Sequence, residues 1–167
     1  MIHNFDLSFK RTVRYKENEM TFDIVHSIDI ETTPERLYDA LTTSKGIAGW
    51  WTPKVKAEPT VGMVNEMSFV GTTLGFRVDK LEPGRIVWSS VEVPPSWDNT
   101  KVLFDITPDG DMTNLQFRHT GFTSQSGDFG ITSYSWAQYV RSIKLLLETG
   151  KGEPFNSQGS RLAGTTR

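Results

Sequence analysis

The sequence contains no cysteine. This absence excludes disulfide bonds, thiolate metal sites and a cysteine nucleophile, and it is typical of proteins from a reducing compartment. No apolar run approaches the roughly 20 residues that a helix needs to cross a bilayer. Near the N-terminus, charged residues such as Asp6, Lys10 and Arg14 interrupt every apolar stretch, so a signal-peptide core is also lacking. These absences predict a cytoplasmic protein with no membrane partner.

The chain also lacks an excess of charge of one sign. It has 18 Lys and Arg residues against 20 Asp and Glu residues, a net charge of −2 with neutral histidine. Nucleic acids attract proteins that carry basic patches, so this balance predicts no nucleic-acid partner. The Gly-x-Ser-x-Gly elbow, the phosphate-binding Gly-Lys-Ser loop and the dinucleotide fingerprint are missing too. The sequence therefore predicts no cofactor and supplies no catalytic assignment.

Composition divides the 167 residues into three ranges. Residues 1–19 are polar with scattered apolar side chains, and we interpret them as an N-terminal extension. Residues 20–155 carry the apolar patterns of one folded domain, a length that a single core accommodates. Residues 156–167 have almost nothing to bury, which predicts a flexible C-terminal tail.

The clearest apolar pattern is a helical stripe in residues 133–150. Trp136, Val140, Ile143 and Leu147 lie four, three and four residues apart, which places them on one side of an α-helix. Gly150 stands where a left-handed residue commonly ends a helix. A long helix with one apolar side must pack on another element, and the preceding chain predicts a sheet.

Most of that preceding chain alternates with the period of two that is typical of β-strands. A first strand over residues 22–30 is followed by two short helices, with Thr33 predicted to cap the first and Ser44 the second. From residue 62, five more alternating stretches are separated by turns that contain Gly or Pro. The sequence thus predicts an α+β fold with a six-stranded antiparallel sheet, two short helices after the first strand and one long C-terminal helix.

Three segments of the sequence carry a resemblance to a known family. They are IDIETTPERLYDALTTSKGIAGWW at residues 28–51, LQFRHTGF at residues 115–122 and SWAQYVRSIKLLLETGKGEP at residues 135–154. In these segments the chain resembles the START-like superfamily called SRPBCC. Within it, the chain resembles the branch named after the activator of the ninety-kilodalton heat-shock chaperone's ATPase. The resemblance implies a helix-grip fold, in which a bent sheet wraps around the long helix and leaves a pocket between them.

The inward faces of the predicted strands and helix supply candidate ligand-binding residues. His26 and His119 share their strand faces with apolar residues, so period two points both imidazoles inward. Each is open to three interpretations: a structural histidine bonded to protein, a polar contact for an apolar ligand, or a metal ligand. Trp50 and Trp51 suggest a plug at a helix end rather than a binding surface, and Trp97 either covers the pocket mouth or rests on the surface. The full candidate set is His26, Met67, Phe69, Phe76, Trp88, Phe104, Phe117, His119, Trp136, Tyr139, Val140 and Ile143.

Three functions remain open at this point. The first is binding of a small hydrophobic or aromatic molecule in the pocket between the sheet and the C-terminal helix. The second is an enzyme that acts on an aromatic or polyketide-type substrate, as the cyclase members of the superfamily do. The third is a protein-binding module with a chaperone as partner, and a homodimer is also compatible with the sequence. No metal and no catalytic residue is assigned.

Overall fold

The structure is a computed structural model that describes residues 20–164. The predicted N-terminal extension, residues 1–19, lies outside the described residues. The elements follow one another as β1 (Phe22–Ile30), α1 (Pro34–Thr42), α2 (Ser44–Trp50), β2 (Lys54–Lys56), β3 (Val64–Phe69), β4 (Thr72–Glu82), β5 (Arg85–Glu92), the 3₁₀ turn η1 (Pro95–Trp97), β6 (Lys101–Asp109), β7 (Met112–Phe122), α3 (Asp128–Thr149) and α4 (Gln158–Leu162).

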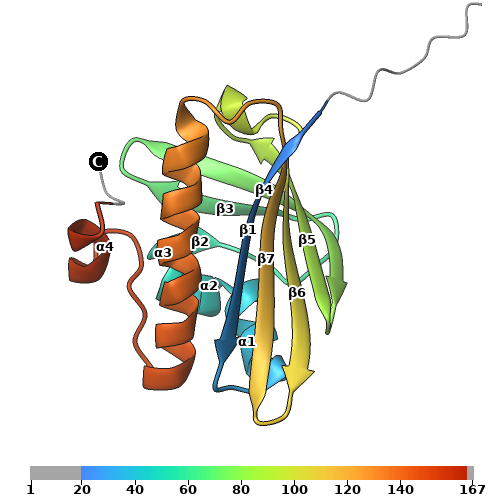
Figure 1. The fold of residues 1–167 in the computed structure, drawn as a ribbon, viewed down its shortest axis with the longest axis vertical. Helices are drawn as coiled ribbons and strands as arrows, with labels where there is room; N and C mark the ends of the chain where they lie inside the picture. Colours follow the sequence, from blue (N-terminus) through green and yellow to red (C-terminus); the bar gives the residue numbers. More distant parts are fainter. Residues whose placement is uncertain (1–19, 165–167) are drawn as a thin grey trace, which may run out of the picture.

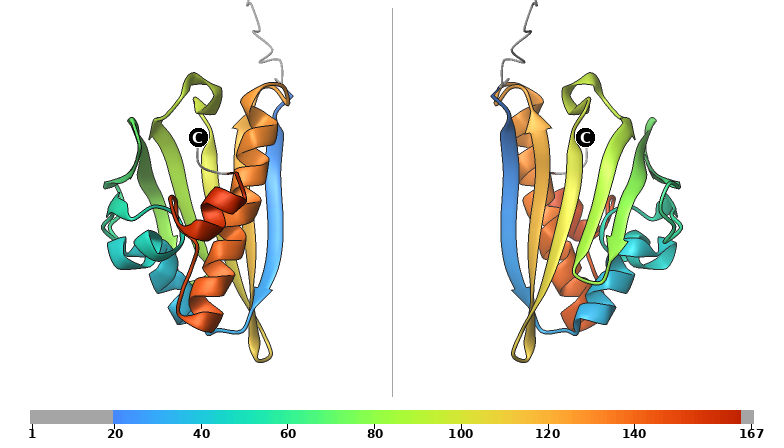
Figure 2. Two further views of the ribbon diagram at one scale, coloured as in Figure 1. Left: turned by 90° about the vertical axis from the view of Figure 1, so that its left-hand side faces the viewer. Right: turned by 90° about the vertical axis from the view of Figure 1, so that its right-hand side faces the viewer.

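All strands belong to one antiparallel sheet in the order β1-β7-β6-β5-β4-β3-β2. The six predicted strands are present, and the short β2 adds a seventh at one edge. The sheet bends around α3, so that its two ends lie on either side of the helix (Figures 1 and 2). The register shifts at two places between β4 and β5, where local bulges increase the bend. The predicted α+β helix-grip architecture is confirmed.

Helix α3 packs on the concave side of the sheet. It begins at Asp128, five residues before the predicted start, and ends at Gly150, whose φ of +79° is left-handed as expected. Trp136, Val140, Ile143 and Leu147 are all buried, since the apolar stripe faces the concave side of the sheet. The prediction of the helix and its inward face is confirmed.

Helices α1 and α2 close one end of the sheet on the same side as α3 (Figure 2). Thr33 caps α1 by accepting a hydrogen bond from the Arg36 N–H, as predicted. Thr43 caps α2 through the Gly46 N–H, so the prediction that Ser44 is this cap is wrong, and Ser44 is the first helical residue instead. Thr43 and Ser44 are adjacent residues that both favour the cap position, and sequence alone does not say which of them is the last residue before the helix.

Side chains from α3 bond two backbone groups at the end of the edge strand β1. Lys144 Nζ donates to the Asp29 carbonyl, and Glu148 accepts from the Glu31 N–H at 2.8 Å. Lys144 and Glu148 also form an ion pair one helical turn apart, at 2.9 Å. Backbone groups of an edge strand that are bonded in this way are not available to pair with another chain.

After α3 the chain turns back and runs beside that helix to α4 (Figure 1). The structure thus differs from the tail expected for residues 156–167, because Gln158–Leu162 is helical and Ser157 caps it. Flexibility of the tail stays a prediction. No helix within residues 20–164 combines the length and the apolar character that a membrane crossing requires.

Candidate functional site

A partly open pocket of about 270 Å³ lies between the first half of α3 and the β3–β4 end of the sheet. Six aromatic side chains form most of its wall, and none of the described residues that line it carries a charge. Val70 and Ile131, which are 79% and 69% exposed, lie at its rim. The lining consists of Trp51, Phe69, Val70, Thr72, Leu74, Trp97, Ile131, Thr132, Ser135, Trp136, Tyr139 and Phe155.

Several elements far apart in the sequence build this wall. One face of α3 contributes Ile131, Thr132, Ser135, Trp136 and Tyr139, whose spacing follows the helical repeat. The hairpin of β3 and β4 forms the opposite wall. A helix is about 10 Å wide, so it does not fill the whole width of a curved sheet, and the pocket remains where the sheet bends away.

Two segments outside the sheet and α3 complete the pocket. Trp97 in the 3₁₀ turn η1 donates from its indole Nε1 to Thr132 Oγ1 at 3.3 Å. The Phe155 N–H donates to the Trp51 carbonyl at 2.7 Å, and the Phe155 ring meets Phe69 edge-on at 5.0 Å. The segment after α3 is therefore held against the residue that follows α2, and both contribute aromatic wall.

His119 lies behind the pocket in a closed hydrogen-bond network. Trp136 Nε1 donates to His119 Nδ1 at 3.0 Å, and the second ring nitrogen is 2.9 Å from Thr100 Oγ1. An indole N–H can only donate, so Nδ1 is the acceptor and Nε2 carries the proton. Thr100 Oγ1 in turn donates to the Trp97 carbonyl at 2.7 Å. The network joins β7, η1, α3 and Thr100, which directly precedes β6, and it fixes two aromatic residues of the pocket wall.

Burial lowers the pKa of His119 from 6.5 to about 3. The ring is 0% exposed and both nitrogens have protein partners, so the imidazole is neutral. This geometry corresponds to the interpretation of a structural histidine. It gives the His119 ring no route to act as an acid or base on a molecule in the pocket.

His26 points toward α3, as the alternation of β1 predicts. Its Nε2 lies 3.2 Å from the Ser133 carbonyl, and its ring stacks on Phe117 with centroids 6.1 Å apart. It lies on the strand next to His119, but it does not line the pocket. Among the residues that the structure describes, no cluster of three or more His, Asp or Glu side chains could hold a metal ion.

Comparison with known proteins identifies the family. Residues 31–148, more than half of the chain, match the family model described as Activator of Hsp90 ATPase homolog 1-like protein. The chain belongs to this family. The match also confirms the resemblance to the START-like SRPBCC superfamily.

Solved structures agree with this membership of the Activator of Hsp90 ATPase homolog 1-like family. The Aha1 dimer from Colwellia psychrerythraea is 32% identical, with a TM-score of 0.74 over 78% of this chain and 99% of that one. MLL2253 from Mesorhizobium loti is 28% identical, with a TM-score of 0.67 over 75% of this chain and 96% of that one. DynU16, from the dynemicin biosynthetic locus, is 22% identical with a TM-score of 0.66 over 78% of this chain and 48% of that one, and shows the shared fold alone. None of the curated proteins matches this family member.

The structure divides the candidate ligand-binding residues of this family member into three groups. Phe69, Trp136 and Tyr139 line the pocket, and His26 packs between β1 and α3 beyond it. The remaining candidates lie in the packed core, each no more than 3% exposed: Met67, Phe76, Trp88, Phe104, Phe117, His119, Val140 and Ile143. Period two identifies the inner face of each strand correctly, but most of that face is packed against other core side chains rather than open space.

Several pocket residues were not among the candidates. Trp51 was interpreted as a plug, and it does stack on Trp50 with centroids 5.5 Å apart, but its ring also lines the pocket. Phe155, at the end of the predicted domain, also lines the pocket. An isolated aromatic residue just after a helix, as at Phe155, is a signal that could have suggested a folded-back segment. Trp97 is half-buried and lines the pocket, so it does not simply rest on the surface.

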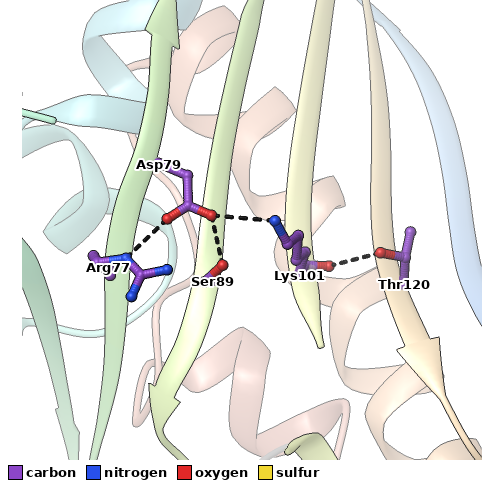
Figure 3. Close-up of polar contacts among 5 residues, drawn as sticks. All are labelled: Arg77, Asp79, Ser89, Lys101 and Thr120. Carbon is purple, nitrogen blue, oxygen red and sulfur yellow. Dashed lines mark hydrogen bonds and ion pairs between the residues drawn. The ribbon is translucent and has the colours of Figure 1, made fainter. Parts of the chain in front are cut away.

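The outer face of the sheet carries a separate polar cluster, drawn in Figure 3. Asp79 accepts from Arg77 Nε at 3.0 Å, Ser89 Oγ at 2.5 Å and Lys101 Nζ at 3.4 Å. Burial raises the pKa of Asp79, but these three hydrogen bonds together outweigh it and hold the pKa below its usual value. The cluster ties β4, β5 and β6 together on the side away from the pocket, so its contribution is to the sheet.

Proposed function

We propose that this protein binds a small hydrophobic or aromatic molecule in the pocket between the sheet and α3. The observation that supports the proposal is the pocket itself: six aromatic rings surround a partly open space with no charged lining residue among those described. Ligand pockets are typically concave, mostly apolar and supplied with a few polar groups. A cavity of about 150 Å³ holds one benzene ring, so about 270 Å³ is room for a ligand of about two rings.

The shape of the pocket also supports binding over simple packing. The core beside it is filled by Trp88, Phe104 and Phe117, each 0% exposed, so the inner face of the sheet buries large rings completely where other core side chains pack against it. At the pocket, rings of the same kind line an open volume instead. Burial of apolar ligand surface there is favourable by about 25 cal/mol per Å² before the costs of association are subtracted.

A pocket-filling variant tests the proposal. Ser135 is half-buried on α3 and lines the pocket, so Ser135→Trp is expected to place an indole in the ligand volume. Tyr134→Trp is the matched control, because Tyr134 is 51% exposed on the same helix and does not line the pocket. Native mass spectrometry of the purified protein should show a bound small molecule in wild type and Tyr134→Trp, and none in Ser135→Trp.

Thermal unfolding with a library of aromatic compounds provides a second measurement. A ligand that binds only the folded state raises the melting temperature, by an amount set by its concentration relative to Kd. If no compound raises the melting temperature of wild type and no molecule co-purifies, the proposal fails. The alternative of catalysis on an aromatic substrate stays a prediction, and a turnover assay with the identified ligand tests it.

A protein-binding function is the second candidate, favoured by the family that the chain matches. The family model is named for activation of the Hsp90 ATPase, and the 32% identical Aha1 is described as a dimer. A homodimer and a chaperone partner are therefore proposed as further properties to measure. Light scattering at several concentrations determines the oligomeric state. An ATPase assay with an Hsp90 chaperone tests the partner, and unchanged ATP turnover by the chaperone in the presence of this protein would exclude stimulation.

A further inference from the structure

We infer that the pocket selects an uncharged aromatic ligand that carries a hydrogen-bond acceptor, and that the indole N–H of Trp51 is the group that recognises this acceptor. The inference rests on the proposed ligand-binding function and adds the chemistry of the ligand. It follows from the hydrogen bonds of the five tryptophans in the chain.

Four of the five indole N–H groups are not offered to a ligand. Trp50 donates to the Ala40 carbonyl at 2.9 Å, and the N–H groups of Trp97 and Trp136 donate to Thr132 and His119 as described above. The Nε1 atom of Trp88 is sealed in the core without a partner and does not line the pocket.

Trp51 differs from the other four. The Trp51 Nε1 atom donates no hydrogen bond within residues 20–164. Unlike Trp88 Nε1, however, it is not among the buried polar atoms that lack a partner in that range. The atom therefore keeps accessible surface, although the whole residue is only 2% exposed. Since Trp51 lines the pocket, that surface faces the ligand volume. A donor in this position is available to a bound molecule.

The ring of Trp51 is held in place before any ligand arrives. It stacks nearly parallel on Trp50 at 5.5 Å and on Trp88 at 6.4 Å, with interplanar angles of 7° and 6°. Trp136 packs against the Trp51 ring with centroids 4.8 Å apart. The Trp51 backbone carbonyl accepts a hydrogen bond from the Phe155 N–H. A donor that is already oriented costs little entropy when it binds, so it discriminates well between ligands with and without an acceptor.

The second property that we infer for the ligand, its lack of charge, follows from the absence of charge among the described lining residues. A carboxylate or an ammonium group buried there would lose its hydration without an opposite charge to replace it. Aromatic rings attract cations through their faces, so a quaternary ammonium ligand is the strongest competing occupant. The test below includes it.

Four naphthalene compounds form a matched series of probes: 2-acetylnaphthalene, 2-ethylnaphthalene, 2-naphthoate and the 2-naphthyltrimethylammonium ion. The first two differ by a carbonyl in place of a methylene group. Isothermal titration with wild type, Trp51→Phe and Trp97→Phe gives their dissociation constants. Trp97→Phe is the control, because it also reduces a pocket ring but removes an N–H that is already bonded to Thr132.

Trp51→Phe is expected to weaken binding of the acetyl compound about tenfold more than binding of the ethyl compound, which corresponds to about 1.4 kcal/mol. Trp97→Phe should weaken both equally. In nitrogen–proton NMR spectra of wild type, the acetyl compound should move the Trp51 indole proton downfield, and the ethyl compound should not. This spectral comparison does not require that Trp51→Phe fold.

Each contrary result has a distinct meaning. If both neutral probes bind and Trp51→Phe affects them equally, with no indole shift, the role of Trp51 is wrong while the proposed function stands. Tighter binding of 2-naphthoate or of the ammonium probe than of the acetyl compound overturns the requirement for an uncharged ligand. If no probe binds, the proposed function and this inference both fail for two-ring ligands.

Discussion

Burial keeps His119 neutral well below the pH at which a free histidine becomes charged. Its pKa of about 3 in the folded state lies below its ordinary value of 6.5, because burial removes the ring from water and disfavours its charged form. Between these two values the unfolded chain binds one more proton than the folded chain. Stability therefore falls as the pH decreases from 6.5 toward 3.

We predict a pH-dependent stability that is traceable to this one side chain. Below pH 6.5 the slope should approach about 1.4 kcal/mol per pH unit. The carboxyl groups of Asp79 and Glu148, whose pKa values are lowered, lose their contribution only as the pH falls below about 4.5, so pH 5–6.5 isolates the histidine. Urea unfolding across that range measures the slope.

His119→Asn supplies the comparison for the pH prediction. Asparagine does not titrate, so the variant should be less stable at pH 7 by about 1–3 kcal/mol, since a buried hydrogen bond is lost or weakened. Its stability should be nearly constant between pH 5 and 6.5. A variant that keeps the full wild-type slope would contradict the assignment.

Among the elements, α3 offers a test of backbone conformation that is separate from packing. Gly150 and Gly130 both lie in open space, with no atom within 4 Å of an added Cβ. Gly150 has a φ of +79°, whereas Gly130 lies within the helix. The same substitution should therefore have opposite effects at the two positions.

Gly150→Ala is expected to destabilise the protein by about 1 kcal/mol, because the left-handed conformation strains a side chain. Gly130→Ala is expected to stabilise it by about 0.5 kcal/mol, since alanine loses less conformational entropy in a helix. Chemical denaturation of both variants measures the pair. Equal shifts in the same direction would show that packing, rather than φ, controls these positions.

At the scale of the whole molecule, the pocket depends on chain segments that meet only after folding. Phe155 follows α3 and is half-buried against Phe69, whereas Phe104 and Phe117 are completely buried between sheet and helix. Phe155 belongs to the pocket wall, and Phe104 and Phe117 belong to the core. Removal of the Phe155 ring should therefore mainly weaken ligand binding, whereas removal of a core ring should mainly lower stability.

We expect Phe155→Ala to cost about 1 kcal/mol of stability and to weaken ligand binding severalfold, because a wall of the pocket is lost. Phe117→Ala should cost about 3–5 kcal/mol, as is usual for a buried ring. Thermal unfolding and titration with 2-acetylnaphthalene measure both effects. A Phe155→Ala variant that binds with unchanged affinity would remove the folded-back segment from the site.

The local sequence was sufficient to predict the main helix and strands and the face of each that points inward. The spacing of Trp136, Val140, Ile143 and Leu147 determines a helix with one buried side, and the alternation around Ile24 and His26 determines a strand with one inward face. Gly150 determines where the helix ends. These features depend on the backbone repeat and on φ, which neighbouring residues control.

Only the tertiary structure decided which inward residues meet open space. Period two gives the face of Phe76 and Phe69 but not their position along a bent sheet. The rings of Trp51, Trp88 and Trp97 pack against Phe76, which is completely buried, while Phe69 lines the pocket. Trp51 and Phe155 are about a hundred residues apart in sequence, and they meet because the chain folds back after α3. Curvature and such long-range contacts come from the packing of the whole sheet on one helix, so no local pattern encodes them.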